Sequence, residues 1–408
     1  AVFFTRGVVQ NPPYTDAFYY FNAAERLAAG DGLTDTYLWT YIGAPEPWPE
    51  DNIAPSHLYW MPFASLLAGG GMALFGSPGD YAAAQVPFTL MYFGMVCVAF
   101  WLGGRFGKTP RHMWVAGLLA LFSGFFMRFW GATSTFAPYA LVGSLALVCI
   151  GLAVMHKQVR WWLLAGVFAG FGHLTRSDGL LLLIVAFAVL FWPWMRLDMR
   201  RRGLFAVLLL AGYLVVMGPW FLRNLAEIGT ILPVGGTDTA WYTTYDELVN
   251  YPPGVEPSNL FADGLGAFFE TRWLALRNNL GTFIAVEGLV VMAPLMLYGL
   301  WNRRRDPFLR GFWLYALGLH LAMTFVFPLP GFRGGLFHSA AALVPWWAAL
   351  GAVGLDDLVG RAVRRLFKHA HQRFAVLFRH AVPRRPADDG QQRVGDVAGQ
   401  VDVRLHLV

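Results

Sequence analysis

Long apolar blocks, most of them 17 to 23 residues in length, recur along this chain and limit what it can fold into. About 20 consecutive apolar residues are enough for a helix to cross the ~30 Å hydrocarbon core of a bilayer. Only 14% of the residues are charged, whereas a soluble domain carries roughly 25%. The sequence therefore excludes a water-soluble globular enzyme and predicts an all-α, polytopic membrane protein.

The apolar blocks predict a bundle of nine transmembrane helices. A further first span is expected before them, because Ala1 to Phe4 resemble the end of an apolar segment. The nine predicted spans are 82–104, 113–127, 134–155, 161–174, 179–195, 204–222, 281–301, 311–330 and 336–354. Residues 58–76 are also apolar, but Pro62 and three consecutive glycines interrupt them, and we interpret them as a juxtamembrane or re-entrant helix.

The basic residues orient the predicted bundle. With 58–76 outside the membrane, 23 of the 31 Lys and Arg fall on one side and 8 on the other. Short loops rich in Lys and Arg stay in the cytoplasm, so the basic side is the inner one. The cytoplasmic loops between spans hold at most nine residues, which is too few for a nucleotide-binding domain. The positive charge therefore indicates membrane orientation, and we expect no nucleic-acid partner.

This orientation divides the chain into five parts. They are a first extracytoplasmic loop with juxtamembrane helices (1–81), transmembrane helices (82–222), a second extracytoplasmic loop (223–280), transmembrane helices (281–354) and a cytoplasmic tail (355–408). The tail is predicted to begin with a basic amphipathic helix and to be disordered beyond Pro383. The two cysteines, Cys97 and Cys149, lie inside apolar blocks and predict neither a disulfide framework nor a metal site.

The first outer loop carries two candidate functional motifs. Asp16 precedes a helical pattern that stops at Gly30, so it is either an N-cap or a carboxylate held at the membrane surface beside Tyr20. His57 and Tyr59 lie between two prolines in P-S-H-L-Y-W-M-P-F, where they are an interfacial anchor or part of a site. A divalent metal bound by Asp16 with Glu50, Asp51 or His57 is an alternative that the residues leave open.

A third candidate is the short turn T-R-S-D between spans 161–174 and 179–195. Fourteen helical residues extend only about 21 Å, so the turn should lie below the membrane surface. Arg176 and Asp178 then either pair with each other to close the turn, or Arg176 binds an anionic lipid headgroup. Arg223, at the outer end of span 204–222, is a second candidate for binding phosphate. Glu287 and His320 lie within spans, and we expect them to be hydrogen-bonded core residues.

Taken in order, these motifs resemble the GT-C superfamily of integral-membrane glycosyltransferases, in particular bacterial relatives of protein O-mannosyltransferases and lipid A aminoarabinose transferases. The motifs are Y-T-D-A-F-Y-Y, A-x-x-L-x-x-G-x-G, P-S-H-L-Y-W-M-P-F, H-L-T-R-S-D-G and P-W-F-L-R-N. The chain departs from the family pattern in having a single Asp16 followed by Ala17, and Pro55-Ser56-His57 where relatives have a double proline.

The resemblance implies a GT-C type fold and an inverting transfer of a sugar from a polyprenyl-phosphate donor. The acceptor would be a protein, lipid or polysaccharide hydroxyl on the extracytoplasmic face of the cell membrane. It implies that Asp16 is the general base and that Arg176 binds the donor phosphate, supported by Arg223 or a metal. The alternatives are a secondary transporter or lipid flippase that uses Arg176, Asp178 and Glu287, and a non-catalytic assembly factor.

Overall fold

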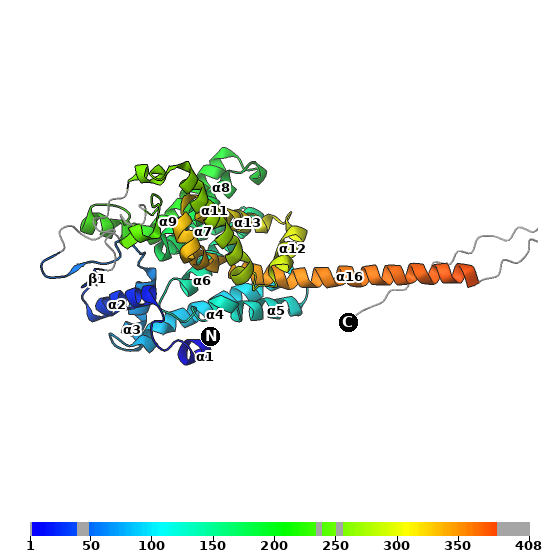
Figure 1. Ribbon diagram of the computed structural model, residues 1–408, viewed down its shortest axis with the longest axis horizontal. Coiled ribbons are helices and arrows are strands. Elements are labelled where there is room, and N and C mark those ends of the chain that lie inside the picture. The colour runs from blue at the N-terminus through cyan, green and yellow to red at the C-terminus, as the bar shows by residue number, and fades with distance from the viewer. Residues whose placement is uncertain (1, 39–48, 234–238, 250–255, 382–408) are drawn as a thin grey trace, which may run out of the picture. The chain divides into compact units, whose positions relative to one another are not determined.

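The computed structural model describes residues 2–38, 49–233, 239–249 and 256–381, and helices dominate this part of the chain (Figure 1). Residues 1–358 form one compact unit. The longer helices of this unit are α2 (Thr15–Ala29), α3 (Phe63–Phe75), α4 (Tyr81–Phe106), α5 (Pro110–Leu121), α6 (Phe136–His156), α7 (Val159–Thr175), α8 (Leu180–Phe191), α9 (Met199–Ile228), α11 (Gly264–Thr282), α12 (Ala293–Arg303) and α13 (Arg310–Leu321). The last helix, α16 (Val344–Ala381), continues beyond this unit, and the predicted disordered tail lies outside the described residues.

Five of the described helical segments are long and apolar enough to cross a membrane. They are Tyr81–Phe106, Phe136–His156, Met199–Ile228, Pro307–Val326 and Gly331–Arg365. The other four predicted spans contain shorter helices, namely α5, α7, α8 and α12. The prediction of an all-α, polytopic membrane fold is confirmed, whereas the number of spans stays a prediction.

Glycines bring α7 and α9 into close contact. A Cβ added at Gly166 would lie 2.0 Å from the carbonyl oxygen of Leu209, and one at Gly212 would lie 2.3 Å from that of Leu163. Larger side chains at these positions would force the two backbones apart, as in other membrane helix pairs that pack through small residues. This contact fixes the end of α7, from which the T-R-S-D turn projects.

Two short strands and two helices cover one end of the bundle. Strand β1 (Thr34–Asp35) pairs antiparallel with β2 (Ala54–Pro55), and α2 packs against α3. Helix α2 ends at Gly30, whose φ of 94° is the left-handed conformation that glycine favours. Its N-cap is Tyr14 without a side-chain cap, so Asp16 lies in the first turn and is not the capping residue. The N-cap interpretation of Asp16 is therefore wrong.

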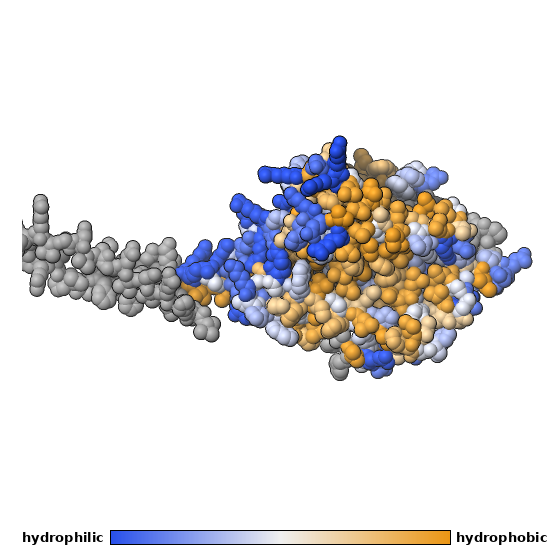
Figure 2. Space-filling model, turned by 180° about the vertical axis from the view of Figure 1, so that it is seen from behind, coloured by the Kyte–Doolittle hydropathy of each residue, from blue (hydrophilic) through white to orange (hydrophobic). Residues whose placement is uncertain are grey.

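Ion pairs gather at the opposite end of the bundle. Helix α4 starts beside α2, where Tyr81 packs against Phe21, and its 26 residues extend about 39 Å. In its last turn, Arg105 pairs with Asp306 at 3.3 Å. Arg303 pairs with Asp357 at the same end, at 2.7 Å. Figure 2 shows hydrophilic side chains gathered on one side of the molecule and exposed apolar side chains over the middle, as expected of a surface that faces lipid.

Glu287 and His320 form a pair inside the bundle. Nε2 of His320 lies 3.0 Å from Oε1 of Glu287, and Trp347 Nε1 donates to the other carboxylate oxygen at 2.8 Å. Glu287 is the last residue of the π-helical segment Phe283–Glu287, and His320 lies just before the π-helical segment Ala322–Val326. The expectation of hydrogen-bonded core residues is confirmed, and each partner reduces the cost of burying the other.

Candidate functional site

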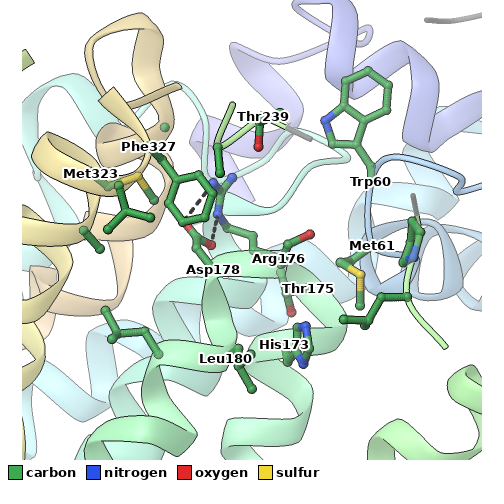
Figure 3. A pocket seen from close by; sticks show the side chains of 18 of the residues that line it. Trp60, Met61, His173, Thr175, Arg176, Asp178, Leu180, Thr239, Met323 and Phe327 are labelled. Atoms are coloured by element: carbon green, nitrogen blue, oxygen red, sulfur yellow. Dashed lines mark hydrogen bonds and ion pairs between the residues drawn. The ribbon is translucent and has the colours of Figure 1, made fainter. Parts of the chain in front are cut away.

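A cavity of about 560 Å³ opens where α7 and α8 meet the segments above the bundle. Its lining is largely apolar and includes Leu181 from α8 and Leu319 from α13. Charged residues also line the cavity, and Figure 3 shows Arg176 and Asp178 with Phe327 beside them and Trp60 and Met61 across from them. A largely apolar cavity with a charged pair in its lining suits an amphipathic molecule that carries an anionic group.

The Arg176–Asp178 ion pair forms the charged end of the cavity. Arg176 Nε donates to Asp178 Oδ1 at 3.0 Å, and Nη2 donates to Oδ2 at 3.1 Å. Burial alone would lower the pKa of Arg176, but the adjacent carboxylate raises it above its ordinary value, so the guanidinium is permanently charged. The pair closes the turn, as one of the two interpretations predicted, and it also lines the cavity.

The carboxylate leaves one edge of the Arg176 guanidinium available. A guanidinium has five N–H donors, and Asp178 accepts from Nε and from one hydrogen of Nη2. Within the described residues, no other acceptor is found for Arg176. The two Nη atoms therefore present a free two-donor fork, the arrangement that binds carboxylate and phosphate oxygens in a bidentate manner.

Asp16 lies within electrostatic reach of this cation. It occupies the first turn of α2, half-buried, and burial raises the pKa of its carboxyl above the ordinary value while Arg176 opposes the rise. The next residue, Ala17, accepts a hydrogen bond from Thr133 Oγ1 at 3.0 Å, which ties the start of α2 to the bundle. A carboxylate of raised pKa is a better proton acceptor than a free one, which suits a general base.

Tyr20 and Tyr59 line the same cavity. Burial, followed by the nearby Asp16 carboxylate in the case of Tyr20, raises the pKa of both phenols, so both are neutral hydrogen-bonding groups. The structure thus places Arg176, Asp178, Tyr20 and Tyr59 in the lining of one cavity. Asp16 is not among the lining residues, but it lies within electrostatic reach of Arg176.

His57 is placed elsewhere, inside the scaffold beneath β2. Its ring nitrogens lie 2.7 Å from Ser56 Oγ and 3.0 Å from Ser65 Oγ, and its φ of 61° is left-handed. Burial lowers the pKa of His57 to about 3, so the ring is neutral. Its backbone N–H donates to the Tyr19 hydroxyl, which in turn donates to Asp35. This network holds α2 against β1 and β2 rather than facing the cavity.

Arg223 also lies apart from the cavity. Its Nη2 donates to the backbone oxygen of Leu33 at 3.2 Å, and its guanidinium packs over the Trp220 ring at 5.0 Å. The residues that line the cavity do not include it. The structure therefore shows Arg223 joining α9 to the loop before β1, and its predicted role in binding phosphate stays untested.

The described residues do not fit a divalent metal site. No group of three or more His, Cys, Asp and Glu side chains converges within 2–38, 49–233, 239–249 and 256–381. Both nitrogens of His57 already have serine partners, and Glu50 and Asp51 are exposed. The charged group that acts on Asp16 is the Arg176 cation rather than another carboxylate, an environment that disfavours a second cation.

Two contributors to the site escaped the sequence analysis. Ser339, inside predicted span 336–354, donates a hydrogen bond to Asp178. His338, which stacks on Phe136 with ring centroids 4.2 Å apart, does not line the cavity but lies within electrostatic reach of Arg176. The only signal in the sequence was a pair of polar residues, His338 and Ser339, near the start of an otherwise apolar block, and nothing there indicated which residues they would meet.

Comparison with solved structures identifies the fold. ArnT from Cupriavidus metallidurans, solved bound to undecaprenyl phosphate, aligns with a TM-score of 0.53 and 18% sequence identity over 84% of this chain and 56% of that one. The archaeal oligosaccharyltransferase AglB from Archaeoglobus fulgidus, solved with an inhibitory peptide and a dolichol-phosphate, aligns with a TM-score of 0.50 and 13% identity over 87% of this chain and 48% of that one. The chain therefore has a GT-C type fold.

The sequence comparison agrees with the GT-C fold. Residues 57–222 match the family described as dolichyl-phosphate-mannose-protein mannosyltransferase. This region includes the Arg176–Asp178 pair but not Asp16. No curated protein sequence matches the chain. The chain spans about half the length of the two solved GT-C proteins. Together, the matched family and the shared fold confirm the predicted resemblance to this superfamily.

Proposed function

We propose that this protein is an inverting glycosyltransferase that moves a sugar from a polyprenyl-phosphate donor to an acceptor hydroxyl. The observation that carries the proposal is the free Nη fork of Arg176 in a largely apolar cavity, with Asp16 in electrostatic reach. A fork of this kind suits one phosphate group, and the apolar lining from α8 and α13 suits an isoprenoid chain. The matched mannosyltransferase family supports the transfer of a sugar.

The proposed reaction is a single displacement. The acceptor O–H gives its proton to the Asp16 carboxylate while its oxygen attacks the anomeric carbon of the sugar. The bond between the anomeric carbon and the phosphate oxygen breaks, and its electron pair leaves with the polyprenyl phosphate. Arg176 stabilises the negative charge that grows on this phosphate, so the leaving group needs no proton. One displacement inverts the anomeric configuration.

The site is proposed to act on the extracytoplasmic face of the cell membrane. The turn with Arg176 belongs to the end of the bundle that carries few basic residues, whereas Arg105, Arg303 and their partners mark the other end. Because basic loops stay in the cytoplasm, the cavity would open on the outer side. A lipid-linked donor can reach that side, where nucleotide sugars are absent. The acceptor is a protein, lipid or polysaccharide.

The transporter alternative finds less support. It requires Arg176, Asp178 and Glu287 to share one path across the membrane. Glu287 instead pairs with His320 and Trp347, and it does not line the cavity that holds Arg176.

The test is a transfer assay with purified protein and radiolabelled polyprenyl-phosphate sugars. Wild-type protein should release free polyprenyl phosphate and a glycoside of inverted configuration, and Arg176→Ala should weaken donor binding. Retention of the anomeric configuration would refute the single displacement. Failure of the wild-type protein to bind any polyprenyl phosphate would refute the proposed function.

A further inference from the structure

Ser339 connects the last part of the compact unit to the ion pair in the cavity. It is the final residue of α15 (Leu336–Ser339) and its side chain is fully buried. Its Oγ lies in hydrogen-bonding contact with Asp178 Oδ2 and 3.0 Å from the backbone oxygen of Gly335. A hydroxyl has one proton to donate. The charged carboxylate is the stronger acceptor, so the proton is directed to Asp178.

The hydrogen bond from Ser339 goes to the same Asp178 oxygen that accepts from Arg176 Nη2. Asp178 Oδ2 accepts from both Ser339 Oγ and Arg176 Nη2, while Oδ1 accepts from Arg176 Nε. Among the described residues, Ser339 is the only side chain besides Arg176 that bonds to this carboxylate. The terminal torsion of an aspartate is broad, so the serine selects its orientation.

The orientation of the carboxylate sets the orientation of the guanidinium. A bidentate pair is planar, because both N–H groups and both oxygens must align. If the carboxylate turned about its Cβ–Cγ bond, Arg176 would either lose one hydrogen bond or turn with it. The free Nη fork would then point away from its present direction in the cavity.

We propose that Ser339 is a positioning residue for the donor phosphate, acting through Asp178 on Arg176. The inference rests on the proposed function, in which the Nη fork binds that phosphate. Ser339 touches neither donor nor acceptor in this scheme, and its contribution is confined to the direction of the fork. Removal of its hydroxyl should therefore weaken donor binding and leave the turnover of saturated enzyme nearly unchanged.

The test measures the affinity of full-length protein for undecaprenyl phosphate in detergent micelles. A hydrogen bond to a charged group is stronger than one between neutral groups, and part of its effect is transmitted to the fork, so Ser339→Ala should raise the dissociation constant about 3- to 10-fold. Ser339→Cys, which keeps the size but is a weak donor, should have a similar effect. Ser339→Thr, which keeps the hydroxyl, should restore most of the affinity.

Ser144→Ala is the matched control. Ser144 is also fully buried, but its hydroxyl donates to the backbone oxygen of Ala342 at 2.6 Å and not to the ion pair. It should lower thermal stability to a similar degree without changing the dissociation constant. The KM for the donor and kcat separate the two roles, because a merely structural loss reduces the amount of active protein at unchanged KM.

A double-mutant cycle decides whether Ser339 acts through Asp178. In an Asp178→Ala background, Ser339→Ala should cause no further loss of affinity. An equal loss in both backgrounds, or wild-type affinity in both Ser339→Ala and Ser339→Cys, would overturn the inference. These outcomes differ from failure of the proposed function, in which wild-type protein itself does not bind undecaprenyl phosphate.

Discussion

Arg176 gives Asp178 two hydrogen bonds, at 3.0 and 3.1 Å, and so satisfies only one edge of its own guanidinium. The carboxylate keeps the arginine charged inside a largely apolar cavity and at the same time fixes the direction of its free edge. An arginine whose N–H groups were all bonded to carboxylates would have no donor left for a phosphate. An arginine without a carboxylate partner would be costly to bury at this depth.

Asp16→Asn should abolish sugar transfer while leaving donor binding intact. The amide cannot accept the acceptor proton, and general-base catalysis typically contributes 10²–10⁴-fold to the rate. Transfer of labelled sugar and binding of undecaprenyl phosphate should be measured on the same preparation. Asp31→Asn, at an exposed carboxylate just after the same helix, is the control and should retain wild-type turnover. Wild-type transfer by Asp16→Asn would show that another group is the base.

The rate should depend on the protonation of Asp16. Burial raises the pKa of this carboxyl above 3.8, and the base works only when deprotonated, so kcat should fall as the pH drops through the raised pKa. Arg176 opposes the rise, and therefore Arg176→Gln at saturating donor should move the acidic limb of the profile to higher pH. A limb that stayed in place or moved to lower pH would contradict electrostatic coupling between the two residues.

Arg176→Ala and Arg223→Ala should have different effects. The first removes the fork that faces the cavity and should weaken donor binding about 10- to 100-fold, the range for hydrogen bonds to a charged group. The second removes a bond to the Leu33 carbonyl and the packing over Trp220, so it should lower the melting temperature with little change in donor affinity. Equal losses of affinity would instead place Arg223 at the phosphate, as the family resemblance implied.

Gly166→Ala should destabilise the bundle. Its added methyl group would lie 2.0 Å from the Leu209 carbonyl oxygen, and overpacking of this kind costs about 1–3 kcal/mol. Thermal unfolding in detergent should show the loss. Gly203→Ala on α9, where an added Cβ meets nothing within 4 Å, should be neutral or slightly stabilising. Similar melting temperatures for the two variants would argue against the close α7–α9 contact.

Single cysteines should report the orientation of the bundle. With Cys97 and Cys149 replaced, Lys108→Cys and Ala262→Cys provide exposed sites, the first at the ion-paired end and the second in the loop before α11. In intact cells an impermeant maleimide should label position 262 and not 108. The reverse pattern would place the site in the cytoplasm and rule out an extracytoplasmic donor.

The sequence was informative wherever a property depends on neighbouring residues. Apolar blocks predicted the helical membrane fold, and Gly30 predicted the end of α2. The short block before Arg176 predicted a turn below the membrane surface, and in the structure this turn lines the cavity. The sequence was less informative about contacts between distant segments. His57 was predicted at an interfacial anchor or site, yet Ser65 and Tyr19 hold it inside the scaffold.

The contact between Ser339 and Asp178 joins positions 161 residues apart, and Asp16 comes from near the beginning of the chain. During synthesis, Asp16 and Arg176 would emerge long before Ser339, which contacts the Arg176–Asp178 pair. A partly inserted polypeptide would thus hold Asp16 and Arg176 without the hydrogen bond that orients the Arg176–Asp178 pair, and it would bind lipid-linked sugars more weakly until its final helices had entered the membrane.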